Sequence, residues 1–169
     1  LRNSNEWSET NLRSHAETRG VDPSRLIFAD RVPMDEHLAR HKLADLFLDT
    51  FTYNAHTTAT EALWAGLPVV TKAGKGFSTR AAASLLTAVG LTELITETEQ
   101  DYEALILHFA TNPEGLAKIR QTLADNRLST PLFDTELFTK HLENGYQQAY
   151  QRHFDGKRSE AIFVPEHLN

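Results

Sequence analysis

The chain has 169 residues, of which 40% are hydrophobic and 24% charged, and it contains no cysteine. This composition predicts one globular domain of ordinary size and excludes disulfides, thiol nucleophiles and cysteine-based zinc sites. The net charge of −6 argues against a general nucleic-acid binder, and no apolar run reaches the length of a membrane span, so neither nucleic acid nor a membrane is expected as a partner.

The start of the chain and its lack of cysteine bear on where the protein is found. It starts at Leu1 without an initiator Met or a signal-peptide pattern, which indicates a piece of a longer protein. The absence of cysteine is compatible with a cytoplasmic location, which we therefore expect.

Short apolar runs alternate with helical patterns in the first half of the chain. The pattern predicts helices over 9–19, 34–43 and 58–64, and strands over 26–28, 46–48 and 69–71. Gly20 and Gly66 are expected to end the first and third of these helices, and Pro68 opens the last strand. Strands that alternate with helices predict a parallel sheet with right-handed crossovers.

The second half is mostly helical. We expect helices over 81–86, 99–110, 113–126 and 135–153, with one last short strand at 94–95. From Gly156 the chain is polar until Ile162-Phe163-Val164-Pro165, a tail that either packs back or touches something else. The fold class is therefore α/β: a Rossmann-like parallel sheet with flanking helices and a helical C-terminal part. Residues 1–155 form this lobe, with the C-terminal helices starting near residue 99, and residues 156–169 form the tail.

Three loops follow the expected strands. They span 29–33, 50–58 and 71–80. Because ligands of open α/β sheets bind beyond the carboxyl ends of the strands, we expect these loops to converge on one crevice.

The middle loop carries the strongest signal, His56-Thr57-Thr58 at a loop-to-helix junction. The first turn of a helix presents unpaired N–H groups and the positive end of the helix dipole, which suits a phosphate or diphosphate. An equal alternative is a helix cap, because Thr58 and Glu61 have the spacing of a capping box.

Other polar residues give weaker signals. Glu61 could hold a ribose diol, although most helical glutamates are merely solvated. His37 and Arg40 share a helix face and could contact a base, but a solvated face is the more common outcome. The basic loop from Lys72 to Arg80 could cradle an anion or be a surface loop, and it lacks the P-loop spacing. No general acid–base pair and no metal-ligand cluster stands out.

Taken together, the chain resembles the C-terminal catalytic lobe of the O-GlcNAc transferase family, which includes SPINDLY-type protein O-fucosyltransferases and many bacterial homologues. The similarity runs from Leu1-Arg2 to about Tyr150. The residues that carry it are, in chain order, Arg25-Leu26-Ile27-Phe28, Val32-Pro33, Glu36-His37, Leu43-Ala44-Asp45, Leu48-Asp49-Thr50, His56-Thr57-Thr58, Leu63-Trp64-Ala65-Gly66, Ser78-Thr79-Arg80, Ala82-Ala83-Ser84 and Ser129-Thr130-Pro131-Leu132-Phe133.

The resemblance implies a GT-B glycosyltransferase lobe with a sugar-nucleotide site. The residues implied in that site are Val32, His37, Arg40, His56, Thr57, Thr58 and Glu61. The first three would surround the base, the next three would hold the diphosphate, and the last would take the ribose position, where animal enzymes carry Asp.

The resemblance also implies the chemistry. A Ser or Thr hydroxyl of an acceptor protein attacks the anomeric carbon with inversion, and no metal or other cofactor is required. The catalytic base belongs to an N-terminal lobe that would precede Leu1, so no catalytic residue is expected in this chain. The tetratricopeptide repeats that recruit protein acceptors would precede it as well.

The donor stays open. Met34 stands where animal enzymes have a lysine that contacts the nucleotide. UDP-GlcNAc is favoured, and GDP-fucose is the alternative. Two other functions remain: a non-catalytic nucleotide- or partner-binding module, and another GT-B enzyme such as a sugar-nucleotide epimerase.

Overall fold

The computed structural model describes residues 5–165. The chain divides between Leu43 and Ala44 into two compact units. The boundary expected near residue 155, between the lobe and the C-terminal tail, stays a prediction. The start of the family similarity at Leu1-Arg2, and residues 166–169 of the expected tail, lie outside the described residues.

The N-terminal unit is built from short helices. Helix α1 spans Glu6–Glu17, and the side chain of Asn5 caps it by accepting a hydrogen bond from the Ser8 amide at 2.8 Å. Gly20 follows with φ 74°, a conformation that favours glycine. Helix α2 spans Met34–Arg40 and continues as a 3-10 turn over His41–Leu43. The two helices expected in this region are thus confirmed.

The prediction of a strand over 26–28 is wrong. A 3-10 helix covers Pro23–Arg25, and Ile27 behind it is 71% exposed. Arg13 of α1 instead organises the segment, donating from Nη1 to the Pro23 carbonyl at 2.6 Å and placing its guanidinium 5.0 Å from the centre of the Phe28 ring. An apolar run forms a strand only where a neighbouring strand accepts its backbone hydrogen bonds, and the described part of this unit has no β-strand.

The second unit contains a parallel sheet of three strands in the order β1-β2-β3. Strand β1 covers Phe47–Leu48, β2 covers Val69–Lys72 and β3 covers Ile95–Thr96. The central strand pairs Val70 with Leu48 on one side and Thr71 with Ile95 on the other. All three strands had been expected within one or two residues of these positions, and the parallel arrangement is confirmed.

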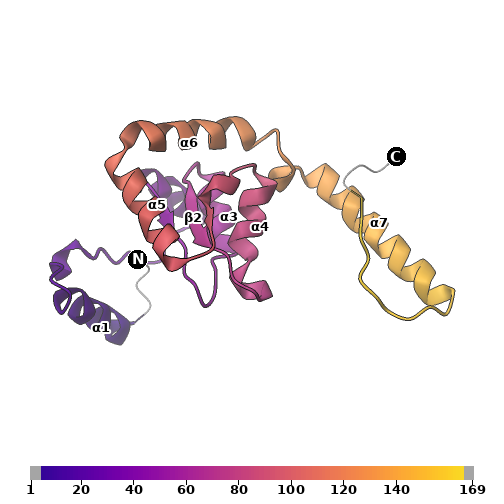
Figure 1. Cartoon of the computed structure of the whole chain (residues 1–169), viewed down its shortest axis with the longest axis horizontal. Helices are drawn as coiled ribbons and strands as arrows, with labels where there is room; N and C mark the ends of the chain where they lie inside the picture. The colour runs from indigo at the N-terminus through magenta and orange to yellow at the C-terminus, as the bar shows by residue number, and fades with distance from the viewer. Residues whose placement is uncertain (1–4, 166–169) are drawn as a thin grey trace. The chain divides into compact units, whose positions relative to one another are not determined.

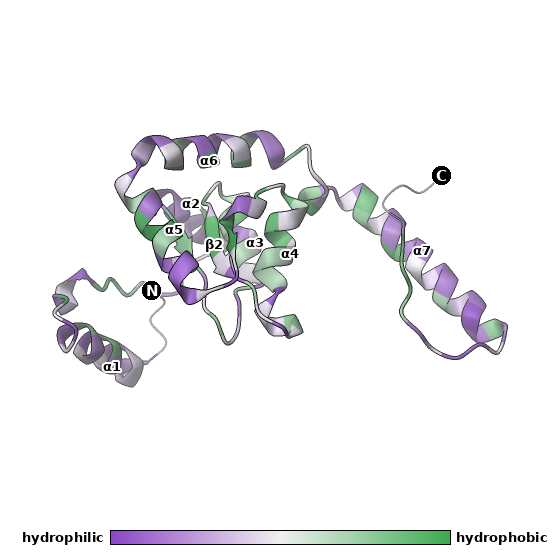
Figure 2. Cartoon of the chain, viewed as in Figure 1, coloured by the Kyte–Doolittle hydropathy of each residue, from purple (hydrophilic) through white to green (hydrophobic). Residues whose placement is uncertain are grey.

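Helices cover both faces of the sheet. Helices α3 (Thr57–Trp64) and α4 (Ala81–Ala88) lie on one side of β2, and α5 (Glu99–Thr111) lies on the other (Figure 1). Helix α6 (Pro113–Asn126) packs against α5. The fully buried core residues are Ala59, Ala62, Leu63, Val69, Val70, Leu86, Val89, Leu91, Leu94 and Leu123. Figure 2 shows the resulting pattern, with apolar residues along β2 and polar residues on the outer helices.

The C-terminal end of α3 is held in two ways. Gly66 has φ 86°, and its position lets the Leu67 amide return to the Ala62 carbonyl at 2.8 Å. Arg127 donates to the Trp64 carbonyl at 2.7 Å. These two contacts fix the position of α3, and a fixed helix holds its first turn at a fixed position too.

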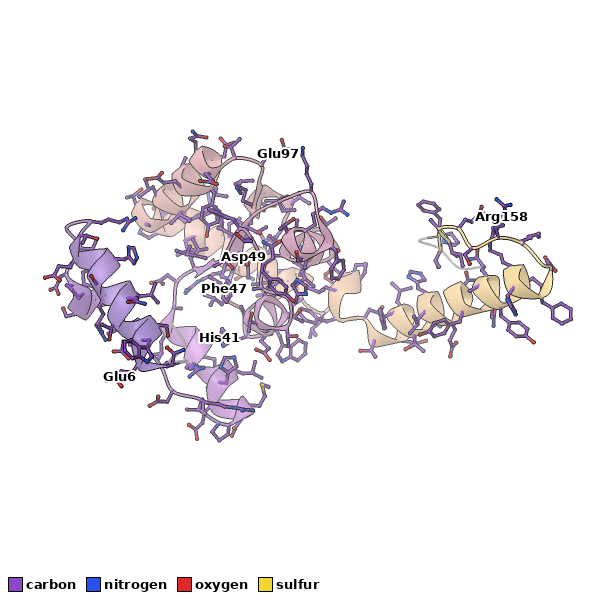
Figure 3. The ribbon with its side chains drawn as sticks, turned by 90° about the horizontal axis from the view of Figure 1, so that it is seen from below. Glu6, His41, Phe47, Asp49, Glu97 and Arg158 are labelled. Carbon is purple, nitrogen blue, oxygen red and sulfur yellow. The ribbon has the colours of Figure 1, made fainter. Side chains whose placement is uncertain are left out.

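The expected C-terminal helix is confirmed as α7, Thr135–Phe154. The tail packs back on it, because Arg152 forms an ion pair with Glu160 at 2.6 Å and donates to the Arg158 carbonyl at 2.9 Å. Figure 3 labels Arg158 on the tail beside α7. A Cβ placed on Gly145 would meet Val164 at 3.4 Å, so the tail lies directly against the helix. Of the two outcomes expected for the tail, the structure shows packing onto α7.

Candidate functional site

The candidate site lies at the carboxyl edge of β1 and β2. The end of β1, the loop 49–56 and the first two residues of α3 line a hollow of about 480 Å³. A second hollow of about 450 Å³ lies next to it, between the start of α3, Phe77 and α4. His56 and Thr57 line both hollows, which makes this junction the centre of the site.

Within the described part of the chain, no side chain caps the first turn of α3. His56 takes the N-cap position, and its carbonyl accepts the first helical hydrogen bond from the Thr60 amide at 3.0 Å. Of the two alternatives for Thr58, the capping box with Glu61 is wrong, because the helix starts one residue earlier and Thr58 lies inside it. The amides of the first turn therefore face the exposed edge together with the exposed side chains of Thr57 and Thr58.

His56 is held between two aromatic rings. Its ring stacks on Tyr53 at 4.9 Å between centroids and meets Phe77 edge-on at 5.6 Å. The Nε2 atom of His56 is buried, and among residues 5–165 it has no hydrogen-bond partner. Because buried polar atoms are normally paired, this nitrogen calls for a ligand or a water molecule.

The loops after β1 and β2 meet, as expected. The Asn54 amide donates to the Ser78 carbonyl at 2.8 Å, and His56 contacts Phe77 across the same junction. The third loop, 29–33, belongs to the N-terminal unit, so its approach to the crevice stays a prediction.

The basic loop after β2 is only partly available to an anion. Lys72 pairs with Glu99 at 3.1 Å, and its ammonium lies 4.4 Å from the centre of the Phe51 ring, so this lysine has a structural role. Gly74 is required there, since a Cβ would lie 2.3 Å from Thr79 Oγ1. Lys75 and Arg80 are the exposed cations of the loop.

The residues expected around the base lie in the N-terminal unit. Arg40 and His37 do share a face of α2, with Arg40 Nη2 2.6 Å from His37 Nδ1. Arg40 also donates to the Asp30 carbonyl at 2.9 Å, and Val32 is half-buried just before α2. In the second unit, Glu61 is half-buried one turn beyond Thr57 and Thr58. Base and ribose contacts by these residues stay predictions.

Sequence reasoning missed two residues beneath the site, Asp49 and Tyr102. Asp49, labelled in Figure 3, follows β1 directly and is 4% exposed. Tyr102 on α5 donates its hydroxyl to the Asp49 carbonyl at 2.8 Å. Burial, and secondly the negative charge of Asp49, raise the pKa of Tyr102 to about 12. Two signals in the sequence pointed to Asp49: it is a polar residue directly after an apolar strand, and it belongs to the Leu48-Asp49-Thr50 segment of the family resemblance.

Two classes of feature are not found in the described part of the chain. Residues 5–165 contain no helix both long and apolar enough to cross a membrane. They also contain no group of three or more His, Cys, Asp or Glu side chains placed to hold a metal ion.

A parallel sheet with helices on both faces places this chain in the class of Rossmann-like α/β lobes, whose ligands bind beyond the carboxyl ends of the strands. The chain belongs to one family within that class, because the family described as glycosyl transferase family 41 matches residues 1–142. This match confirms the resemblance to O-GlcNAc transferases, and the structure confirms the α/β fold class.

Individual proteins that are similar to this chain belong to the same kind of enzyme. The chain is 37% identical over 159 residues to an Arabidopsis thaliana protein named probable UDP-N-acetylglucosamine--peptide N-acetylglucosaminyltransferase SEC, covering 94% of this chain and 16% of that protein. It is 35% identical over 148 residues to the Caenorhabditis elegans UDP-N-acetylglucosamine--peptide N-acetylglucosaminyltransferase, covering 88% and 13%. A solved structure of a mutant O-GlcNAc transferase from Thermobaculum terrenum superposes with a TM-score of 0.82 and 34% identity, over 87% of this chain and 28% of that one.

Proposed function

We propose that this chain is the sugar-nucleotide-binding lobe of a longer cytoplasmic glycosyltransferase that moves GlcNAc from UDP-GlcNAc to Ser or Thr hydroxyls of proteins. The names of its relatives support this donor and this kind of acceptor. The chain spans 16% and 13% of those two relatives, so the acceptor site and the catalytic base belong in this proposal to other parts of the longer protein.

One observation carries the proposal: the first turn of α3, without a side-chain cap among residues 5–165, lies beside a buried histidine nitrogen that has no hydrogen-bond partner among the same residues. Helix amides and the helix dipole favour an anion at this end, and the exposed hydroxyls of Thr57 and Thr58 add two further donors. A diphosphate would satisfy all of these groups together, whereas a neutral ligand would leave the amides without charged acceptors.

Each residue then has a role toward the donor. His56, Thr57 and Thr58 hold the diphosphate and Glu61 the ribose. In the N-terminal unit, Val32, His37 and Arg40 contact the base.

The proposed reaction needs no metal or other cofactor. The acceptor hydroxyl forms the new C–O bond at the anomeric carbon as the bond to the diphosphate breaks, and its proton passes to a base outside this chain. The α3 amides and nearby cations such as Lys75 and Arg80 stabilise the negative charge that develops on the leaving diphosphate.

A titration of the ¹⁵N-labelled chain with UDP tests the site. We expect the largest amide shifts at Thr57 and Thr58, and weaker binding of uridine, which lacks the diphosphate. A parallel titration with GDP decides between the two donor bases. Amides of the first α3 turn that stay unshifted at saturating UDP would contradict the proposal.

The activity is tested on the full-length protein. Transfer of GlcNAc from UDP-GlcNAc to a Ser- or Thr-containing protein supports the proposal. Release of a free sugar epimer without a glycosylated protein would instead identify an epimerase.

A further inference from the structure

Asp49 lines the base of the proposed diphosphate site, and among residues 5–165 it is the only charged residue that is buried. It is 4% exposed, and its carboxylate accepts three hydrogen bonds. Oδ1 accepts from the amides of Thr50 at 2.9 Å and Ala55 at 2.6 Å, and Oδ2 accepts from the Thr71 hydroxyl at 2.7 Å. This carboxylate is therefore well satisfied, as a buried charge must be.

These hydrogen bonds connect the central strand of the sheet to the loop after β1. Thr71 belongs to β2, the central strand, and is fully buried. Ala55 belongs to the loop after β1 and directly precedes His56, the N-cap of α3. One oxygen of Asp49 thus holds the loop, while the other holds the sheet.

The backbone of Asp49 is anchored as well. Its amide donates to the Val70 carbonyl at 3.1 Å, and its carbonyl accepts from the Tyr102 hydroxyl at 2.8 Å. Asp49 consequently cannot shift without disturbing β2 or α5. A loop attached to such a residue keeps its geometry better than one held only by its own turns.

We propose that Asp49 is a positioning residue of the diphosphate site, holding His56 and the first amides of α3 where they meet the ligand. The inference rests on the proposed function, because it assigns to Asp49 the placement of that same site. Asp49 lines the same hollow, but its carboxylate oxygens are engaged by Thr50, Ala55 and Thr71, so in this proposal it acts through Ala55 and not by direct contact with the ligand.

A purely structural role makes a different prediction. It would lower the stability of the fold when Asp49 or its partner is changed, but UDP would bind the remaining folded protein as before. A positioning role also moves the α3 amides in the free protein and weakens UDP binding by the folded fraction.

The test measures UDP affinity and amide shifts on the full chain for D49A, D49N, T71V and T96V. Removing the carboxylate in D49A is expected to weaken UDP binding about tenfold and to shift the amides of Thr57 and Thr58, because hydrogen bonds to a charged group are lost. D49N keeps an acceptor for the Ala55 amide and is expected to restore most of the affinity.

T71V and T96V form a matched pair that keeps the proposal falsifiable if D49A does not fold. Both remove one buried hydroxyl from adjacent strands, but only Thr71 donates to Asp49, whereas Thr96 donates to the Thr71 carbonyl at 3.0 Å. We expect weaker UDP binding in T71V than in T96V. Equal affinities in this pair, or folded D49A with wild-type affinity, would overturn the proposal.

A failure of the proposed function gives a separate result. If the wild-type chain does not bind UDP, the proposed function fails. The amide shifts of the α3 turn in T71V against T96V then still decide whether Asp49 positions that turn.

Discussion

The substitution Tyr102→Phe tests a buried hydrogen bond at the base of the site. It removes only the hydroxyl that donates to the Asp49 carbonyl at 2.8 Å. The ring stays, including its edge-on contact with Phe51 at 4.9 Å between centroids. The change in unfolding free energy therefore reports the hydrogen bond and not a loss of apolar packing.

The magnitude follows from what the substitution leaves behind. Tyr102 is 9% exposed, so its removed hydroxyl leaves a carbonyl with reduced access to water. An unsatisfied buried acceptor costs about 1–3 kcal/mol. For a chain of 169 residues, that corresponds to a melting temperature lower by roughly 2–12 °C.

The pH dependence supplies a second measurement. The pKa of Tyr102 is about 12 in the folded state against an ordinary value of 10.0, so between these values the folded state keeps a proton that the unfolded state releases. The contribution of Tyr102 to stability is therefore complete below pH 10.0 and decreases as the pH rises toward about 12. The stability advantage of the wild type over Y102F should narrow across this interval.

Urea unfolding of both proteins, at neutral pH and at about pH 11, measures both effects. Absorbance titration of the phenols gives an independent value, since the difference between wild type and Y102F isolates Tyr102. Equal stability of the two proteins at neutral pH would refute the hydrogen-bond argument. A stability difference that stays constant up to about pH 11 would refute the argument from the raised pKa.

Three further predictions concern α3. Leu63→Ala, at a fully buried position, should lower the free energy of unfolding by about 2–5 kcal/mol in urea unfolding. The control Leu107→Ala, at a 56% exposed position, should lower it little. A loss below about 1 kcal/mol for Leu63→Ala would contradict the assigned core. Gly66→Ala, at φ 86°, should cost about 1–2 kcal/mol by thermal unfolding, and an unchanged melting temperature would speak against the positive φ. The double substitution T57V/T58V should weaken UDP binding about tenfold in calorimetry with little change in stability, and undiminished affinity would remove both hydroxyls from the site.

Local patterns predicted most of the elements. The apolar periodicity and the capping residues of 99–110, 113–126 and 135–153 correspond to α5, α6 and α7, because helices depend largely on residues three and four apart. The same holds for β2, where Pro68 and the run of β-branched residues mark a buried strand.

The errors arose where a distant partner decides the structure. The run 26–28 is as apolar as a strand, yet Arg13 of α1 holds its neighbourhood and no strand forms. Thr58 and Glu61 have capping spacing, yet His56 takes the N-cap position between Tyr53 and Phe77. Arg13 and Phe77 are remote in sequence from the residues that they contact, whereas Tyr53 is a near neighbour of His56; in both cases contacts outside the local pattern accompany the departure from it.

The sequence by itself determined the fold class, the order of the elements and the place of His56-Thr57-Thr58 at the start of a helix, because these depend on local periodicity and on motif order. Only the tertiary structure decided that this helix start is uncapped, that Lys72 is engaged by Glu99, and that Asp49 lies beneath the site. These features depend on strand register, which brings Asp49 to Thr71 across 22 residues of sequence. No local pattern encodes that register, since it results from packing the whole sheet.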